Sequence, residues 1–497
     1  MSDNKPKPNK AKPKTKNRGN RNVKSEPVNP LDEFWREDKE NAHDNYKFAE
    51  LLSQQVKVSG FEQKAYEDFL ELPICNKLKS NIRHTGKEKC LPIQSYGIQP
   101  ALKGRDILGC APTGTGKTWA FLVPIVEILY KKDRDGNLKR PVISKKDEKH
   151  DHINVYEEKS APNCLILAPT RELAIQLYQE TQKLTRNTGL TSDYVIGGHK
   201  HSLQLVKKEI NILIATPGRL ISFLRAGPTY SSKISLENLE ILVIDEADRM
   251  LDMGFKSDID TIFKASPKNT FRPQTLMYSA TFPDKVKKLT KQYLSSKFVS
   301  IVVGPPGSVN LTIKQKIIEV QNTTQKFQMV FDMVTEIFEN DKKEKEKSRK
   351  QGKIHHTPQI IIFTNHVDYA ETIANKIYNQ TEIDAETVHS DKIQKCREIA
   401  IQQFKDERYH VLVATNIAGR GLDIPRVDYV INFDLPRDVS EYVHRVGRTG
   451  RAGRVGRAIS FFTPKFDYKL GPHLCTALDQ LELEVPDFLD QYRTDVI

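Results

Sequence analysis

The stretch DILGCAPTGTGKTWAF, residues 106–121, joins a short apolar segment to a glycine-rich turn and the start of an apolar helical pattern. Glycines in such a turn let backbone N–H groups close around phosphate oxygens, and the N-terminus of the following helix adds its dipole. We expect Lys117 to reach the β- and γ-phosphates and the Thr118 hydroxyl to bind Mg²⁺. The usual GxxxxGK[ST] pattern requires glycine where this chain has Ala111. The strand–loop–helix context predicts a nucleotide site, and a glycine turn without a ligand is the alternative.

Similar apolar segments recur along the chain. After the turn come CLILAPT, NILIATP, EILVID and TLMYSAT, and beyond residue 310 come QIIIFTN, ETVHSD, HVLVATN, DYVINFD and AISFFTP. Continuous apolar runs are typical of strands that are buried on both faces, as in a parallel sheet flanked by helices. A Pro/Gly turn near residue 304 separates the two series. The sequence therefore predicts two similar α/β domains joined by a short hinge.

We expect the first domain at residues 51–303, a linker at 304–309, the second domain at 310–480 and a C-terminal tail at 481–497. Residues 1–50 are expected to be a disordered basic tail, because the first thirty contain almost nothing apolar. This tail could hold phosphates, act as a nuclear signal or only increase solubility. Two charged insertions, about 133–161 and 339–357, are expected to be mobile surface loops, or for the second a solvated helix extension.

Composition restricts the class of protein. The net charge of +13 favours a polyanionic partner such as nucleic acid, although solubility alone could explain it. Six scattered cysteines without a CxxC pair indicate reduced thiols, and the histidines lack partners at metal-ligand spacing. The longest apolar stretch is too short to cross a bilayer, and no signal peptide is recognisable.

The segment LVIDEADRML, residues 242–251, places three carboxylates directly after a buried strand. In parallel α/β sheets, ligands bind at the carboxyl ends of the strands. Asp245 and Glu246 are thus predicted to lie at the same edge as the phosphate loop. Asp245 can then hold Mg²⁺, and Glu246 can orient and deprotonate the attacking water.

Taken in order, APTGTGKT (111–118), DEAD (245–248) and SAT (279–281) resemble the motifs of DEAD-box RNA helicases of superfamily 2. PTRELA (169–174), TPGR (216–219), ATNIAGRGLDI (414–424) and YVHRVGRTGRAG (442–453) resemble further motifs of that family. The resemblance implies two tandem RecA-like domains, with ATP, Mg²⁺ and RNA as ligands. The flanks of the DEAD motif and the end of the chain are similar to the Vasa-like branch.

The resemblance also implies ATP contacts outside the phosphate loop. Gln94 would hydrogen-bond the adenine edge, and Tyr66 would stack on the base, with Phe69 or Phe61 as alternatives. The family has Pro-Thr where this chain has Cys90-Leu91, so the tie from the adenine motif to the phosphate loop is expected to be looser. The full ATP-binding set is Tyr66, Gln94, Ala111, Pro112, Thr113, Gly114, Thr115, Gly116, Lys117, Thr118 and Asp423.

By the same resemblance, Arg448 and Arg451 act as arginine fingers on the γ-phosphate and join Lys117, Asp245 and Glu246 as catalytic groups. The spacing of three predicts that both lie with Arg445 on one helical turn. Asp423 would bind the ribose or the fingers. The residues expected to couple the two domains are Asp248, Ser279, Thr281 and His444.

The expected RNA track crosses both domains and contacts mainly the RNA backbone. Its residues are Pro169, Thr170, Arg171, Gly198, Thr216, Gly218, Arg219, Thr364, Gln394, Arg397, Thr415 and Gly421. The implied function is RNA-stimulated ATP hydrolysis coupled to domain closure and local unwinding of RNA. An ATP-dependent RNA clamp without productive unwinding, or a DNA translocase on the same fold, are the alternatives. We expect an intracellular monomer of the cytoplasm or nucleus, with ribonucleoprotein granules as a further location and protein cofactors as further partners.

Overall fold

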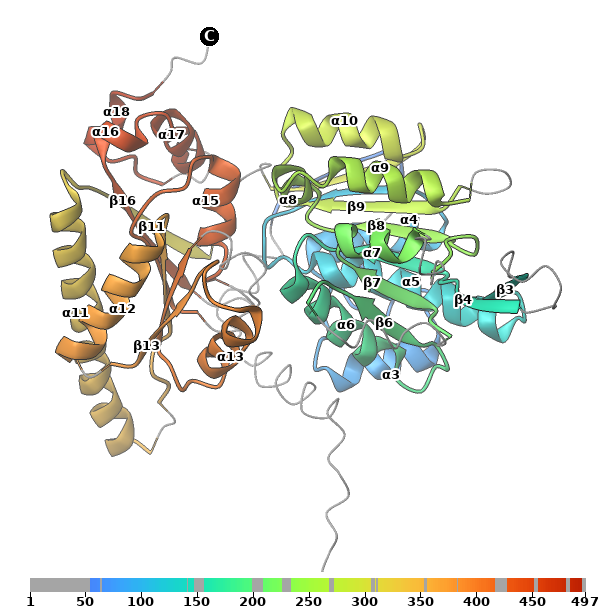
Figure 1. Cartoon of the computed structure of the whole chain (residues 1–497), viewed down its shortest axis with the longest axis horizontal. Coiled ribbons are helices and arrows are strands. Elements are labelled where there is room, and N and C mark those ends of the chain that lie inside the picture. The colour runs from blue at the N-terminus through green and yellow to red at the C-terminus, as the bar shows by residue number, and fades with distance from the viewer. Residues whose placement is uncertain are drawn as a thin grey trace, which may run out of the picture.

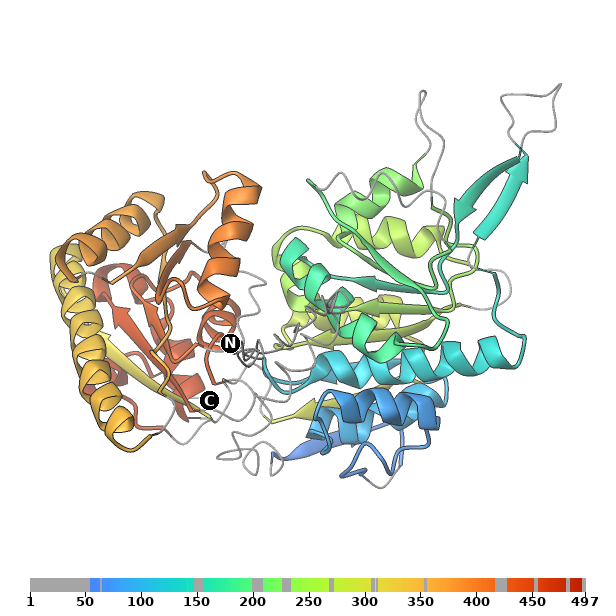
Figure 2. The ribbon, with the colours of Figure 1, turned by 90° about the horizontal axis from the view of Figure 1, so that it is seen from below.

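The computed structural model describes residues 54–62, 65–140, 142–146, 156–198, 209–225, 234–267, 272–304, 309, 312–352, 355–381, 383–415, 427–450, 455–479 and 483–493. They form two α/β domains side by side, each built around one sheet (Figure 1). A view from below shows helices on both faces of each sheet (Figure 2). No helix within the described ranges is long and apolar enough to cross a membrane.

The sheet of the first domain has eight strands in the order β1-β10-β2-β9-β8-β5-β7-β6. Neighbouring strands are parallel except for β1 and β10, which run antiparallel. In sheet order the strands are Val56–Ser59, Val299–Val303, Ile107–Cys110, Gln274–Ser279, Ile241–Ile244, Cys164–Leu167, Ile212–Ala215 and Ser192–Val195.

Strand β5 shows why its sequence is apolar throughout. Cys164 and Ile166 pack into the core on one face of the sheet, and Leu165 and Leu167 pack into the core on the other. Helices α3, α4, α5 and α6 cover the first face, and α7, α8, α9 and α10 cover the second. They span Asn76–His84, Pro92–Leu102, Lys117–Arg134, Arg171–Thr185, Pro217–Leu224, Ala247–Asp252, Lys256–Ala265 and Asp284–Tyr293.

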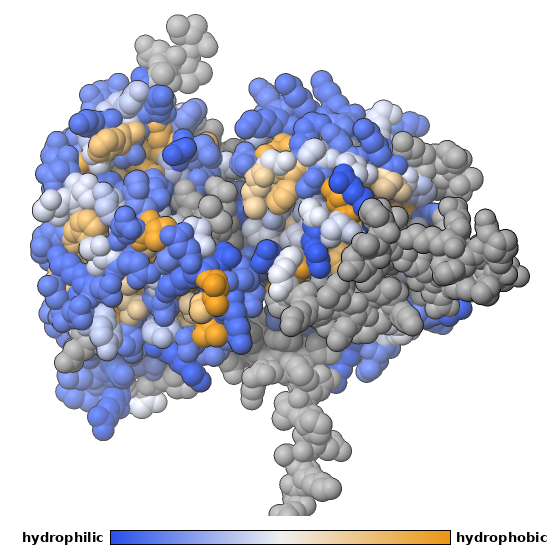
Figure 3. Space-filling view, viewed as in Figure 1, coloured by the Kyte–Doolittle hydropathy of each residue, from blue (hydrophilic) through white to orange (hydrophobic). Residues whose placement is uncertain are grey.

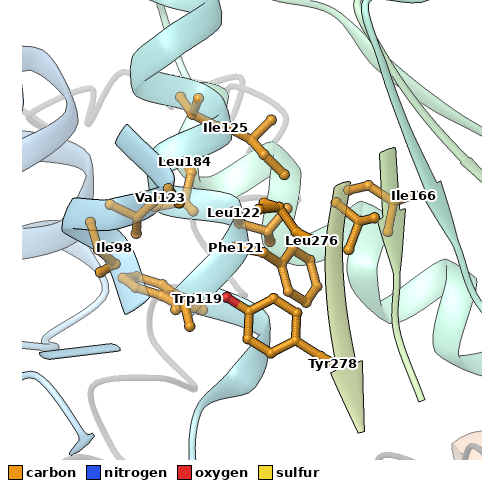
Figure 4. Packing of buried hydrophobic residues seen from close by; sticks show 14 of the residues in the cluster. Ile98, Trp119, Phe121, Leu122, Val123, Ile125, Ile166, Leu184, Leu276 and Tyr278 are labelled. Atoms are coloured by element: carbon orange, nitrogen blue, oxygen red, sulfur yellow. The ribbon is translucent and has the colours of Figure 1, made fainter. Parts of the chain in front are cut away.

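The helix that follows the phosphate loop packs tightly on the sheet (Figure 4). The ring centroid of Phe121 on α5 lies 5.3 Å from that of Tyr278 on β9. A Cβ atom on Gly109 of β2 would lie 2.4 Å from the Tyr278 ring, so only glycine fits there. This contact holds the strand before the phosphate loop against the strand before the SAT segment.

The sheet of the second domain has six parallel strands in the order β11-β16-β15-β12-β14-β13. In that order they are Ile313–Glu319, Gly456–Phe462, Tyr429–Asn432, Ile360–Thr364, Val411–Thr415 and Ala385–Val388. Helices α11 and α12 cover one face, and α13, α15, α17 and α18 cover the other. The helices, including the short α16, are Thr323–Lys350, Val367–Thr381, Gln394–Lys405, Val439–Val446, Pro464–Asp467, Gly471–Asp479 and Asp487–Asp490. The predicted fold class is confirmed.

The first charged insertion differs from the loop that we expected. Residues Val142–Lys146 (β3) and Tyr156–Ser160 (β4) pair as an antiparallel ribbon that projects from the first domain (Figures 1 and 2). Its strands contain valine, isoleucine and tyrosine, which favour extended backbone despite the surrounding charge. The second insertion continues α11 to Lys350 with exposed residues, in line with the helix extension.

The expected boundary at residue 480 cuts through a packed segment. Leu489 on α18 is fully buried in the core of the second domain. The rings of Phe488 and Tyr492 lie 5.7 and 5.4 Å from that of Phe462 on β16. Residues 483–493 therefore belong to the second domain, because these apolar side chains complete its core.

Candidate functional site

The phosphate loop connects β2 to α5 near the middle of the first sheet. Gly114 and Gly116 have φ angles of 80° and 84°, which side chains with a Cβ rarely adopt. The Lys117 ammonium donates to the carbonyl oxygens of Ala111 (2.7 Å) and Pro112 (3.0 Å), so it lies inside the loop. The Thr115 hydroxyl donates to the Pro112 carbonyl at 2.7 Å and closes the turn. The loop is thus a tight turn around the Lys117 ammonium, and its binding of phosphate stays a prediction.

The adenine motif touches this loop directly. Gln94, on the first turn of α4, donates from Nε2 to the carbonyl of Gly116 at 2.9 Å and accepts from the Leu91 N–H at 2.9 Å. A Cβ atom on Gly116 would lie 2.3 Å from Gln94 Nε2 and 2.9 Å from the Leu91 side chain. Gln94 and Leu91 therefore lie against the phosphate loop themselves, and the looser coupling expected from Cys90-Leu91 stays a prediction.

The three aromatic candidates for the base differ in exposure. Phe69 is only 1% exposed and packs edge-on against Trp119, with ring centroids 5.6 Å apart. Tyr66 is half-buried, and its hydroxyl accepts from Gln99 at 3.2 Å. Phe61 is half-buried beneath the Arg105 guanidinium. Phe69 is a core residue, which leaves Tyr66 and Phe61 for stacking.

The carboxylates follow β8, two strands away from β2, at the same edge of the sheet. Glu246 has φ 50° and ψ 53°, a left-handed conformation that is uncommon for a residue with a side chain. Helix α8 begins immediately after it. The Asp245 carboxylate accepts from the Glu246 N–H at 3.0 Å, and the Glu246 carboxylate accepts from Arg249 at 2.7 Å. Strained backbone of this kind is concentrated at functional sites.

The two carboxyl groups have opposite pKa shifts. Burial and the neighbouring Glu246 raise the pKa of Asp245 to about 7. Burial also opposes the charge of Glu246, but Arg249, His444 and Arg448 outweigh it and lower the pKa of Glu246 to about 2. Burial lowers the pKa of Lys117 despite the nearby carboxylates. Glu246 is thus held as a carboxylate, whereas for Asp245 the attraction of Lys117 does not offset burial and the charge of Glu246.

The structure brings all four predicted coupling residues together. The buried Asp248 carboxylate accepts from the Thr281 N–H (2.8 Å) and the Thr281 hydroxyl (2.7 Å). The Ser279 hydroxyl donates to the Thr281 carbonyl at 2.7 Å. His444 Nε2, from α15 of the second domain, lies 3.6 Å from the Asp248 carboxylate. Burial opposes the charge of Asp248, but His444 and Thr281 lower its pKa well below the ordinary value.

Two more contacts join the domains beside this network. The hydroxyl oxygens of Thr281 and Ser440 lie 3.4 Å apart. The Thr113 hydroxyl donates to the Gly447 carbonyl at 3.5 Å, and a Cβ atom on Gly447 would lie 1.8 Å from the Thr113 hydroxyl oxygen. The sequence reasoning missed Ser440, which lies just before the motif that carried the resemblance.

The arginines do not share one helical turn as the spacing predicted. Helix α15 ends at Val446 because Gly447 begins a turn, so Arg448 lies in that turn. Arg448 is 4% exposed and donates from Nε to the His444 carbonyl at 3.1 Å. Arg445 instead donates to the Asp434 carbonyl and to Asn365, within its own domain. Arg451, Asp423 and Gly421 lie outside the described residues.

The predicted RNA contacts of the first domain follow the ends of three strands, β5, β6 and β7. Thr170 caps α6 by accepting from the Leu173 N–H at 3.3 Å, directly after Pro169. A Cβ atom on Gly198 would lie 2.8 Å from an Arg171 guanidinium nitrogen, so these two residues touch. Thr216 is the N-cap residue of α7, which carries Gly218 and Arg219.

The predicted contacts of the second domain are more varied. Thr364 ends β12 fully buried, and its hydroxyl donates to Asp434 at 2.7 Å. Gln394 donates to Glu172 of the first domain at 3.2 Å. Thr415 ends β14 and lines a pocket of about 560 Å³ whose wall also includes Asp252 from the first domain. Within the described ranges, the buried Nε atoms of Arg219 and Arg397 have no hydrogen-bond acceptor.

Comparisons with known proteins identify two family domains in this chain. The DEAD/DEAH box helicase family matches residues 91–289, and the helicase conserved C-terminal domain matches residues 325–453. A probable ATP-dependent RNA helicase DDX4 from Pelophylax lessonae is 37% identical over 443 residues, which cover 88% of this chain and 55% of the relative. Its counterpart from Homo sapiens is 35% identical with the same coverage. The chain thus spans about half the length of these relatives.

Among solved structures, the fold is similar to that of Dbp5 from S. cerevisiae bound to RNA and ADP BeF3. The TM-score is 0.66 at 25% sequence identity, and the match covers 86% of this chain and 97% of Dbp5.

Proposed function

The chain belongs to the DEAD-box helicase family, and from this premise we propose that it is an RNA-stimulated ATPase that closes its two domains on RNA and opens short duplexes locally. The observation that carries the proposal is that three segments meet where the two domains touch. The phosphate loop, the DEAD segment and the α15 end are joined by the Thr113–Gly447 and Asp248–His444 contacts. The protein's named relatives are RNA helicases.

In this proposal the phosphate loop holds the triphosphate through its backbone N–H groups, and Lys117 moves from the loop carbonyls to the phosphates. Gln94 reads the adenine edge, and Tyr66 or Phe61 stacks on the ring. Because Gln94 also contacts Gly116, adenine recognition and the loop conformation are linked. Glu246, held ionised by Arg249, orients the attacking water and accepts its proton.

The donor set also fits Mg²⁺, which prefers carboxylate and hydroxyl oxygens. Thr118 and Asp245 would hold the ion, and a cation would relieve the repulsion from Glu246 that raises the pKa of Asp245. When bound, Mg²⁺ neutralises charge that develops on the phosphates. Arg448 comes from the second domain, so its guanidinium reaches the γ-phosphate only when the domains are closed; Arg451 and Asp423 are proposed to assist there.

We propose that RNA lies across the strand ends that carry Arg171, Arg219, Thr415, Gln394 and Arg397. The unpaired Nε atoms of Arg219 and Arg397 support this, because buried donors normally find an acceptor. Asp248, Ser279 and Thr281 relay closure to His444, and reopening after hydrolysis would release the strand. The proposed working unit is a monomer inside the cell, with residues 51–303 and 310–493 as its two domains.

The test compares Glu246→Gln with the wild type in RNA-stimulated ATPase and RNA-binding assays. We expect turnover to fall at least about a hundredfold, as is typical of loss of a general base, while ATP-dependent RNA binding is retained. Normal hydrolysis by Glu246→Gln would reject the assigned base. Stimulation by DNA equal to that by RNA of the same sequence would favour the translocase. RNA binding without strand separation would favour the clamp.

A further inference from the structure

A cluster of exposed side chains lies just after the end of β16. Phe466 is 70% exposed and Tyr468 is 50% exposed. Exposed aromatic rings of this size are uncommon, and adjacent ones often mark a binding surface. The face of the molecule in Figure 3 is mostly hydrophilic, with only small apolar groups. We call Lys465, Phe466, Tyr468 and Lys469 the aromatic patch.

Each ring of the aromatic patch has its own cation. Lys465 Nζ lies 5.7 Å from the Phe466 ring centroid, and Lys469 Nζ lies 5.8 Å from that of Tyr468. Asp467, the one acidic residue between them, turns inward and accepts from the Thr463 N–H at 2.7 Å. All four side chains of the aromatic patch are therefore exposed around this short turn, with each ring beside a lysine. This combination suits single-stranded nucleic acid, since bases stack on rings while cations contact phosphates.

The position of the aromatic patch also favours binding of single-stranded RNA. In a parallel sheet all strands end at one edge, so β16 ends at the same edge as β12 and β14, which carry Thr364 and Thr415. Only β15 separates β16 from β12. At about 4.8 Å between strands, the end of β16 lies about 10 Å from that of β12. The aromatic patch thus extends the edge that carries the proposed RNA contacts.

We propose that the aromatic patch binds one or two bases of a single-stranded RNA. This RNA would continue beyond the proposed RNA contacts of the second domain. The inference rests on the proposed function, because it assumes that RNA crosses this edge. Stacking on rings tolerates any base, so the patch adds affinity for longer strands without sequence preference. An acidic protein segment would be the competing occupant, but it would not require two rings that are each beside a cation.

The test uses the full chain with a non-hydrolysable ATP analogue, Mg²⁺ and fluorescent oligouridines of about 6 and about 16 nucleotides. Phe466→Ala/Tyr468→Ala should weaken binding of the long RNA about 5- to 100-fold, the equivalent of roughly 1–3 kcal/mol of stacking. Binding of the short RNA and the ATPase rate at saturating short RNA should not change. Tyr378→Ala, which removes a 59% exposed ring from α12, is the matched control and should bind both RNAs normally.

Two further variants separate stacking from charge. Phe466→Trp/Tyr468→Trp should keep the long-RNA affinity, and Lys465→Gln/Lys469→Gln should reduce the salt slope of long-RNA binding by about 1.4. Unchanged binding of the long RNA by the alanine variant would overturn the proposal. The competing occupant, an acidic protein segment, would then be favoured. An equal loss for both RNAs would also overturn it, since the effect would then be structural. If the wild type bound neither RNA, the proposed function itself would fail.

Discussion

Gly447 offers a direct way to block closure with little change inside either domain. Its φ of −67° is ordinary for any residue, and within the second domain the nearest atom to a Cβ would be the Val443 carbonyl oxygen at 3.0 Å, a tight contact. A Cβ atom there would lie 1.8 Å from the hydroxyl oxygen of Thr113 and 3.0 Å from its Cβ, in the first domain. An ordinary contact would need about 1.6 Å more space. Rotating the Thr113 hydroxyl relieves the first contact but not the second.

Overpacking of this kind costs about 1–3 kcal/mol, so Gly447→Ala should lower the closed-to-open ratio about 5- to 100-fold. RNA affinity with a non-hydrolysable ATP analogue should fall by the same factor, whereas the urea unfolding curve should move little. Adding Thr113→Ala removes the contact with the hydroxyl but leaves the 3.0 Å contact with the Cβ atom of residue 113, so it should restore part of the affinity. The steric reasoning is refuted if Gly447→Ala closes on RNA like the wild type, or if Thr113→Ala gives no rescue.

Two other changes test the network and the core. Because Asp248 has a lowered pKa in the folded chain, it stabilises the fold above its unfolded pKa of about 3.9 and loses this effect as the pH falls below that value. Asp248→Asn should therefore have a lower free energy of unfolding in urea than the wild type at pH 7. This difference should shrink below about pH 4. A difference that is independent of pH would contradict the role of the charge. Gly109→Ala should lose about 1–3 kcal/mol of unfolding free energy, because its Cβ would lie 2.4 Å from the buried Tyr278 ring. A denaturation midpoint equal to that of the wild type would mean that the sheet can accommodate the methyl group.

The strands and the phosphate loop could be predicted because their signals are local. A run such as Cys164–Leu167 has apolar residues facing both helix layers, so its pattern alone indicates a parallel sheet. The C-terminal boundary could not be predicted in this way. Leu489 is buried by tertiary contacts that its short, acidic surroundings do not indicate.

In the candidate site, too, local sequence predicts some residues, whereas other contacts depend on the tertiary structure. Asp245, Glu246 and Lys117 follow from motif spacing, whereas the helix end at Val446 depends on the turn that Gly447 begins. The contact from Gln94 to Gly116 joins the adenine motif to the phosphate loop, and no spacing rule indicates it. Ser440 was missed because its role comes from the approach of two domains that are remote in sequence.

The third carboxylate of the DEAD segment contacts both domains. Asp248 belongs to the short helix that begins next to Glu246, and its oxygens are shared between Thr281 in its own domain and His444 in the other. His444 also supplies the carbonyl that holds Arg448. A shift of α15 therefore moves the partner of Asp248 and the arginine beside Glu246 together. In the proposed function, loading of the first domain and arrival of the arginine would thus be linked through one side chain as well as through the bound nucleotide.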